Sequence, residues 1–174
     1  MNNKISLYIP AYNAENTIEK CIESVLTQTL KPSEIIVIND CSRDKTLSLI
    51  KKFDEIKIVN NNKNFGLAKS RNIALEVSKF DLIASIDSDV VCDKNWLEIL
   101  HNTMISKKID LIGGRLVEIN VHNKINLWRS IYLKQNWGNQ SFENPDFIFG
   151  ANSLINKKTL KNFKITYDER LKTN

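Results

Sequence analysis

Two aspartates, Asp87 and Asp89, stand two positions apart at the end of an apolar run, in the stretch SIDSDVV (85–91). Ionised carboxylates are costly to bury and rarely lie beside a core strand without a partner. Hard oxygen ligands suit Mg²⁺ or Mn²⁺, and one or two carboxylates with substrate phosphates commonly hold such an ion. The pair therefore indicates a divalent-metal site for a diphosphate. The alternative is that Asp89 or Asp93 caps the following helix, and we expect Asp93 to be such a cap.

The rest of the chain predicts a rim on which these carboxylates would lie. Apolar runs at 5–9, 34–38, 56–59 and 81–86 alternate with helical patterns, which is typical of a parallel sheet covered on both faces. Polar clusters follow the four runs in turn: PAYNAE, NDCSRD, NNNKNFG and DSD. Ligands of such sheets bind outside the carboxyl ends of the strands. We therefore expect one α/β domain, 1–174, with all four clusters on one rim.

Apolar residues at helical spacing predict the helices between these strands. The first, around 18–26, has Asn13 as a candidate N-cap, and the second follows Ser42 or Asp44. Further expected elements are a helix over 67–77, a helix with Trp96, Leu97, Leu100 and Met104 inward, and a fifth strand over 110–119. A helix is also expected within 126–140, with Trp128, Ile131 and Tyr132 partly buried.

Composition and charge set the class of protein. The chain is 42% hydrophobic and 26% charged, which is the balance of an ordinary soluble domain. Residues 120–174 carry nine basic and four acidic side chains, so they hold the whole net charge of +5. That bias indicates a surface approaching anionic lipid or an anionic substrate, unless it is only a solvated face. Three widely spaced cysteines and the lack of an apolar run of about 18 residues make a reducing cytoplasm the default location.

The usual phosphate-binding loops are absent from the sequence. No GxGxxG follows the first strand, which disfavours a dinucleotide-binding oxidoreductase, and no GxxxxGK followed by Ser or Thr occurs. A phosphate bound at the rim would need its charge neutralised by something else, such as a metal ion. A sugar-phosphate nucleotidyltransferase would favour a glycine- and basic-rich loop after the first strand, and PAYNAE is neither.

Five segments follow one another along the chain: IPAYNAENTIEKCIESVLTQT, IIVINDCSRDKT, NFGLAKSRN, SIDSDV and FGANSLINKKTL. Together they resemble family 2 glycosyltransferases, which have a GT-A fold and transfer sugar from a nucleotide diphosphate. The resemblance extends from about Ile5 to Leu171. It implies a mostly parallel sheet flanked by helices on both faces. Residues 1–119 would be the nucleotide-binding part, and 120–174 the start of an acceptor-binding part.

The resemblance also assigns roles to residues. Tyr12 would pack against the nucleobase, Asp40 would accept a hydrogen bond from an imide N–H such as that of uracil, and Arg71 would reach the nucleotide. Asp89 would ligate Mn²⁺ or Mg²⁺ between the phosphates, and Asp87 would contact ribose or metal. On their residue types alone, core packing of Tyr12, a turn role for Asp40 and a solvated Arg71 stay open. The other residues assigned to the donor nucleotide are Pro10, Ala11, Asn13, Glu15, Gly66 and Ser88, and Gly150, Ala151 and Asn152 would lie beside the donor sugar and acceptor.

The chain departs from the family pattern after the second strand and at its end. Asn39 replaces a frequent aspartate, and Cys41 stands where glycine is frequent, so this turn must accept a side chain. In the family, a segment resembling YDERL is followed within several residues by an acidic pair containing the catalytic base, whereas this chain ends at Asn174. We therefore expect the base beyond Asn174. Asp168 and Glu169 stand before that position, which favours a turn or capping role for them.

The resemblance implies a metal-assisted, inverting transfer from a UDP-sugar to a saccharide or lipid-linked acceptor in cell-surface polysaccharide biosynthesis. It implies no nucleic-acid partner. The basic region favours a peripheral association with the inner face of a membrane, and a chain ending at Asn174 would expose apolar surface and associate with itself. The alternatives are a non-catalytic nucleotide-sugar-binding domain of a larger enzyme and, less in keeping with its loops, a sugar-phosphate nucleotidyltransferase.

Overall fold

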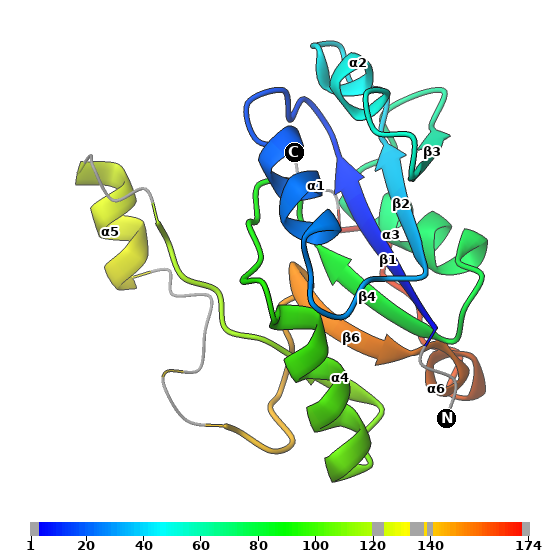
Figure 1. Cartoon of the computed structure of the whole chain (residues 1–174), viewed down its shortest axis with the longest axis vertical. Helices are drawn as coiled ribbons and strands as arrows, with labels where there is room; N and C mark the ends of the chain where they lie inside the picture. The colour runs from blue at the N-terminus through cyan, green and yellow to red at the C-terminus, as the bar shows by residue number, and fades with distance from the viewer. Residues whose placement is uncertain (1–3, 120–123, 133–137, 139–140, 172–174) are drawn as a thin grey trace.

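The computed structural model describes residues 4–119, 124–132, 138 and 141–171, and it holds a six-stranded sheet with helices on both faces (Figure 1). The strands are β1 (Ile5–Ala11), β2 (Glu34–Asn39), β3 (Ile56–Asn60), β4 (Leu82–Ile86), β5 (Leu111–Gly113) and β6 (Asn152–Asn156). The helices are α1 (Ile18–Leu26), α2 (Thr46–Ile50), α3 (Leu67–Val77), α4 (Trp96–Lys107), α5 (Lys124–Tyr132) and α6 (Lys157–Asn162). The order in the sheet is β3-β2-β1-β4-β6-β5, and the first four strands are parallel. The α/β class and the first four predicted strands are confirmed.

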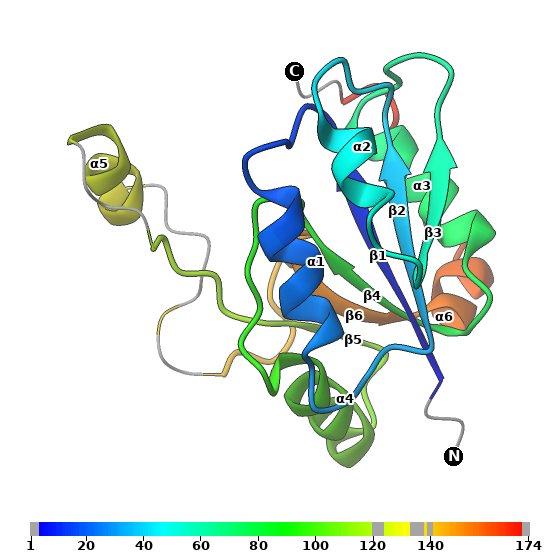
Figure 2. The same ribbon diagram turned by 45° about the horizontal axis from the view of Figure 1, so that its top comes forward.

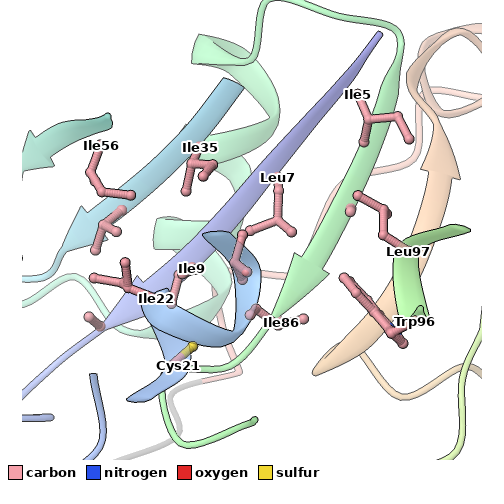
Figure 3. Packing of buried hydrophobic residues seen from close by; sticks show 14 of the residues in the cluster. Ile5, Leu7, Ile9, Cys21, Ile22, Ile35, Ile56, Ile86, Trp96 and Leu97 are labelled. Carbon is pink, nitrogen blue, oxygen red and sulfur yellow. The ribbon is translucent and has the colours of Figure 1, made fainter. Parts of the chain in front are cut away.

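Alternate residues of β1 belong to two separate cores, because successive side chains of a strand point to opposite faces. Leu7 belongs to the larger core with Ile22 of α1 (Figure 3). Tyr8 belongs to the smaller core with Ala74 of α3, against which Leu160 of α6 packs. Figure 2 shows the same division, with α1, α2 and α4 on one face of the sheet and α3 and α6 on the other. A strand covered on both faces is mostly apolar throughout, which explains the continuous apolar runs in the sequence.

β1 extends two residues further than predicted, through Pro10 to Ala11. Proline lacks the N–H that a central strand normally donates. Here β4 pairs with β1 only as far as Tyr8, so Pro10 lies beyond the part of β1 that has partners on both sides. The extension carries the chain directly to Tyr12 at the edge of the sheet.

The far side of the sheet differs from the prediction. The strand expected over 110–119 is only three residues long, as β5, and it pairs antiparallel with β6, which was not predicted. β6 lies between β4 and β5 and is antiparallel to both. The pairing ends where the Gly114 N–H donates to the carbonyl oxygen of Asn152, at 3.0 Å. Because the partners of β6 are remote in the sequence, its local pattern carries little information about the pairing.

Two predicted helix caps are wrong. Thr17, not Asn13, precedes α1, and Asn13 instead has a φ of 50° and accepts a hydrogen bond from the Arg43 N–H. Asn95, not Asp93, precedes α4, and Asp93 offers its backbone oxygen rather than its carboxylate to the first N–H of that helix. In both places, contacts within or between loops replace the local capping that the residue types favour.

Helix α5 stands away from the sheet in both views (Figures 1 and 2). Trp128 and Tyr132 are 51% and 68% exposed, and Ile131 is exposed to a similar degree, so the partial burial expected for these side chains is wrong. The rings of Trp128 and Tyr132 contact each other, with centroids 5.4 Å apart. Among the helices that the structure describes, none is both long and apolar enough to cross a bilayer.

The carboxylate of Glu34, at the start of β2, connects that strand to its neighbours. Oε2 accepts hydrogen bonds from Ser6 Oγ at 2.6 Å and from the Lys79 N–H at 2.9 Å, and the Lys57 ammonium lies 3.5 Å from Oε1. Burial alone would raise the pKa of Glu34, but these hydrogen bonds and the Lys57 charge outweigh burial and lower the pKa.

We expect Glu34→Gln to lower the free energy of unfolding at pH 7 by about 1–2 kcal/mol, because charge-assisted hydrogen bonds are lost while a neutral amide still accepts one. The pKa is lower in the folded state, so this stabilisation is present above the unfolded pKa of about 4.3 and is lost as the pH falls through the folded value. Urea unfolding of both chains between neutral and acid pH measures the difference. A difference that stays constant down to the lowest pH would contradict the assignment.

Candidate functional site

The loops after the parallel strands β1, β2, β3 and β4 leave the sheet at one edge and form the predicted rim (Figure 1). Reciprocal hydrogen bonds join the first two loops: the N–H of Asn13 donates to Ser42 Oγ (3.0 Å), that of Glu15 to Asp44 Oδ2 (3.0 Å), that of Arg43 to Asn13 Oδ1 (2.9 Å) and that of Lys45 to Glu15 Oε2 (3.0 Å). Asn13 and Glu15 therefore hold the loop after β1 against the loop after β2. Tyr12, between them and β1, keeps 45% of its surface exposed, so the core-packing alternative for it is excluded.

Asp40 is buried beneath the rim, with 3% of its surface exposed. Its Oδ1 accepts hydrogen bonds from Asn61 Nδ2 (2.7 Å) and the Phe65 N–H (2.9 Å), and its Oδ2 accepts one from the Gly66 N–H (2.8 Å). The Asp40 N–H donates to the carbonyl oxygen of Ala11 at 2.9 Å. Asp40 thus ties β1 and β2 to the loop that starts α3. A carboxylate accepts about four hydrogen bonds, so Oδ2 keeps capacity for one more.

Arg71 of α3 forms an ion pair with Asp87 at the end of β4, with Nη2 2.7 Å from Oδ1. The two side chains are only 12% and 30% exposed, so Arg71 is not a solvated surface arginine. A Cβ added to Gly150 would lie 2.6 Å from Arg71 Nη1, so a residue with a side chain does not fit there without moving the guanidinium. Burial would lower the pKa of Arg71, but the Asp87 carboxylate outweighs burial and raises the pKa.

The carboxylates singled out by the sequence differ in their surroundings. Asp87 and Ser88 are half-buried, whereas Asp89 is exposed in the turn after β4. Arg71 donates one hydrogen bond to Oδ1 of Asp87, so Oδ2 of Asp87 is the oxygen more open to a metal in this arrangement. In the described part of the chain, no three His, Cys, Asp or Glu side chains are grouped as a metal cage. The residues present fit an ion held by one or two carboxylates and completed by substrate phosphates.

The segment from Gly150 to Asn152 lies next to Arg71, but the side chains of Ala151 and Asn152 are used in packing within the domain. Ala151 and Asn152 are buried. The Trp96 indole N–H donates to Asn152 Oδ1 at 2.6 Å, and Asn152 Nδ2 donates to the carbonyl oxygen of Arg115 at 3.1 Å. The Asn152 amide therefore joins α4, β6 and the chain after β5. A contact of these residues with the donor sugar or acceptor stays a prediction.

Residues 6–163 match the sequence profile of the family described as Glycosyl transferase family 2. The chain belongs to this family. The match covers almost the whole described sheet, from β1 to α6.

Known relatives support the same family assignment. WfgD of Escherichia coli, a UDP-Glc:alpha-D-GlcNAc-diphosphoundecaprenol beta-1,3-glucosyltransferase, is 36% identical over 118 residues, which are 67% of this chain and 47% of WfgD. The structure of S. aureus TarS 1-349 with UDP gives a TM-score of 0.78 at 22% identity, covering 98% of this chain and 52% of that one. The mannosyltransferase PcManGT from Pyrobaculum calidifontis, solved with GDP-Man and Mn²⁺, gives 0.70 at 16% identity over 92% and 46%. The GT-A fold is thereby confirmed, and the chain spans less than half the length of the curated relatives that it matches first.

Both acidic residues near the end of the described chain, Asp168 and Glu169, have partners. Asp168 Oδ1 accepts a hydrogen bond from the Arg170 N–H at 3.0 Å, so the expected turn role of Asp168 is confirmed. Glu169 Oε1 accepts hydrogen bonds from Asn72 Nδ2 (2.9 Å) and Lys69 Nζ (3.0 Å). The hydrogen bonds from Arg170 lower the pKa of Asp168, and those from Asn72 and Lys69 lower the pKa of Glu169. The lower pKa makes both carboxylates weaker bases.

The three cysteines are free thiols. Burial raises the pKa of Cys92 to about 12 and raises that of Cys21, so both stay protonated near neutral pH. Cys21 Sγ donates to the carbonyl oxygen of Asp87 at 3.5 Å, directly beneath the turn that carries Asp89. Cys41 has a φ of 61°, so the turn after β2 accepts a side chain in a left-handed conformation, as the departure from glycine implied.

Two residues of the site were given no role by the sequence. Asn61, which holds Asp40, belongs to the polar cluster after β3. Tyr167, in YDERL, places its ring centroid 5.4 Å from the Arg71 guanidinium carbon. Asn61 stands in a polar cluster and Tyr167 in a segment of the family pattern, but neither pattern tells which of its side chains turns inward.

Proposed function

We propose that this glycosyltransferase takes a UDP-sugar as donor and transfers the sugar with inversion to an acceptor hydroxyl. The observation that carries the proposal is the grouping of Tyr12, Asp40, Arg71 and the Asp87–Asp89 turn at one edge of a family 2 domain. WfgD is named for a UDP-Glc donor and TarS was solved with UDP, which supports the same nucleotide here.

In this proposal the exposed Tyr12 ring packs on uracil, and the remaining acceptor capacity of Asp40 Oδ2 takes the imide N–H. The two residues are close because the Asp40 N–H is bonded to Ala11, which precedes Tyr12. In the same proposal, Pro10 and Ala11 lie beneath the nucleoside, and Gly66 and Ser88 lie beside it. Arg71 presents its cation towards the ribose and diphosphate, with Asp87 holding the guanidinium in place.

A divalent ion, Mn²⁺ or Mg²⁺, would be held by Asp89 and by the oxygen of Asp87 that Arg71 does not use. When bound, the ion would stabilise the charge of the nucleotide diphosphate as it leaves. PcManGT was solved with Mn²⁺, which supports a metal in this fold. Arg71 already neutralises part of the charge of Asp87, so the exposed Asp89 would be the stronger metal ligand of the pair.

The acceptor and the catalytic base belong to the activity of the whole protein. The name of WfgD describes a diphosphoundecaprenol-linked acceptor, which supports a lipid-linked or saccharide acceptor here and a part in cell-surface polysaccharide synthesis. The catalytic base expected beyond Asn174, the division at residue 119, the association with the inner membrane face and the self-association stay predictions.

Nucleotide preference tests the proposal. We expect UDP with Mn²⁺ to raise the melting temperature more than ADP or CDP does, because only uracil offers Asp40 an imide N–H. One charge-assisted hydrogen bond is worth roughly 1.5–3 kcal/mol, which corresponds to an affinity difference of about tenfold or more. Thermal-shift titrations with each nucleotide measure this.

Mn²⁺ alone and uridine alone are the controls. Equal stabilisation by ADP, CDP and UDP would reject UDP as the preferred nucleotide. Turnover of a UDP-sugar, measured as UDP release, separates an active transferase from a domain that only binds nucleotide.

A further inference from the structure

We propose that Tyr167 is a positioning residue of the donor site, which holds the Arg71 guanidinium against Asp87. The proposal rests on the proposed function of this rim as a nucleotide-sugar site. Tyr167 lies far from α3 in the sequence, yet its ring centroid is 5.4 Å from the Arg71 guanidinium carbon. A cation at this distance over an aromatic ring is attracted to it, and more strongly where water is excluded.

The backbone of Tyr167 is fixed to α3 by a single side chain. Asn72 Oδ1 accepts a hydrogen bond from the Tyr167 N–H at 2.9 Å, and Asn72 Nδ2 donates to the Tyr167 carbonyl oxygen at 2.9 Å. The same Nδ2 donates to Glu169 Oε1, which also accepts from Lys69 Nζ. Asn72 follows Arg71 directly in the helix. The contacts that hold this segment therefore come from the same turn of α3 as the arginine.

The Tyr167 ring is also fixed at its far end. Its hydroxyl lies 3.3 Å from the hydroxyl of Tyr8, within hydrogen-bond distance. Tyr8 is buried in β1, the central strand that leads to the rim. The ring is thus held at its backbone by α3 and at its hydroxyl by the core of the sheet. Because the Tyr167 side chain is fixed at both ends, its ring stays in place and limits the positions that the guanidinium can take.

The other contacts of Arg71 do not fix its position fully, so the position of its guanidinium depends on the Tyr167 ring. Asp87 binds one end of the guanidinium, and a side chain at Gly150 would displace Nη1. Arg71 Nε is buried without a hydrogen-bond partner among the described residues, so no hydrogen bond fixes the guanidinium from that side. Without the Tyr167 ring, the long arginine side chain would regain rotamers in which Nη2 leaves Asp87.

Binding of UDP with Mn²⁺, measured by calorimetry up to millimolar nucleotide, tests the proposal. We expect Tyr167→Leu to weaken binding by about 3–30-fold, since the cation–ring contact of about 0.5–2 kcal/mol is lost. Tyr167→Phe keeps the ring and should restore the affinity to within about threefold of the original. Phe163→Leu is the matched control, because this exposed aromatic residue lies in the same part of the chain, and we expect it to leave binding unchanged.

A mutant cycle identifies the route of the effect. If Tyr167 acts by holding Arg71, Tyr167→Leu should have no further effect in an Arg71→Ala chain. An equal loss in both backgrounds would overturn the proposal, as would unchanged binding by Tyr167→Leu alone. Should Tyr167→Leu fail to fold, Asn72→Ala releases the same segment from the surface of α3 and should give the same pattern.

A readout without nucleotide separates this inference from the proposed function. In the ligand-free chain, the Arg71 guanidinium should show restricted rotation by NMR in the original protein and in Tyr167→Phe, and free rotation in Tyr167→Leu. Free rotation in all three chains would overturn the positioning role. If instead the restriction follows Tyr167 as expected but no chain binds UDP, the proposed function fails while the positioning of Arg71 stands.

Discussion

Replacing Asp40 by alanine should lower the free energy of unfolding by about 2–4 kcal/mol, because buried donors lose a charged acceptor. The Phe65 and Gly66 N–H groups and the Asn61 amide all donate to this carboxylate. Gly66, with a φ of 88°, directly precedes α3, so the change should loosen the start of the helix that carries Arg71. UDP affinity should fall by about tenfold or more in addition, since the acceptor for the imide N–H is removed.

Asp40→Asn separates the two effects. An asparagine keeps one acceptor oxygen for the loop but presents an amide where a second carboxylate oxygen was. We expect it to retain more stability than Asp40→Ala while losing as much preference for UDP over CDP. Urea unfolding and nucleotide titration on the three chains give both quantities. An Asp40→Ala chain with unaltered stability and an unaltered preference for UDP would contradict the role assigned to this residue.

Asp89→Asn should abolish the metal-dependent part of UDP binding and leave the fold intact. Asp89 is exposed after β4, so its charge stabilises no buried contact, whereas a hard cation needs an anionic oxygen there. We expect the UDP affinity in Mn²⁺ to fall by about tenfold or more, to the value that the original chain has in EDTA. Calorimetry with and without Mn²⁺ measures the difference.

Asp93→Asn is the matched control for this change. Asp93 is an exposed aspartate in the same segment, and its carboxylate does not cap α4. The substitution should therefore alter neither stability nor metal-dependent binding. If the original chain binds UDP equally tightly in Mn²⁺ and in EDTA, the metal role of Asp89 is wrong.

The sequence by itself determined the parallel half of the fold and the edge at which the site lies. The runs that form β1 to β4 are apolar because helices cover both faces of the sheet. Side chains on both faces of each strand must therefore be apolar, and the sequence shows this as continuous apolar runs. Parallel strands direct their carboxyl ends to one edge, so the grouping of the clusters that contain Tyr12, Asp40 and Asp87 followed from the topology alone. These features are local or periodic, so they can be recognised in a single amino-acid sequence.

The tertiary structure decided everything that depends on contacts between distant segments. β6 is inserted antiparallel between β4 and β5, and the pairing was invisible because its partners are remote in the chain. The same holds for side chains: Asn13 binds the neighbouring loop rather than a helix, and Asn152 holds Trp96. Arg71 meets both Asp87 and Tyr167 because α3, the end of β4 and the chain after α6 converge at one place. A motif fixes which residue types are present, whereas packing decides which atoms they bind, since each side chain bonds the nearest partner that the completed fold supplies.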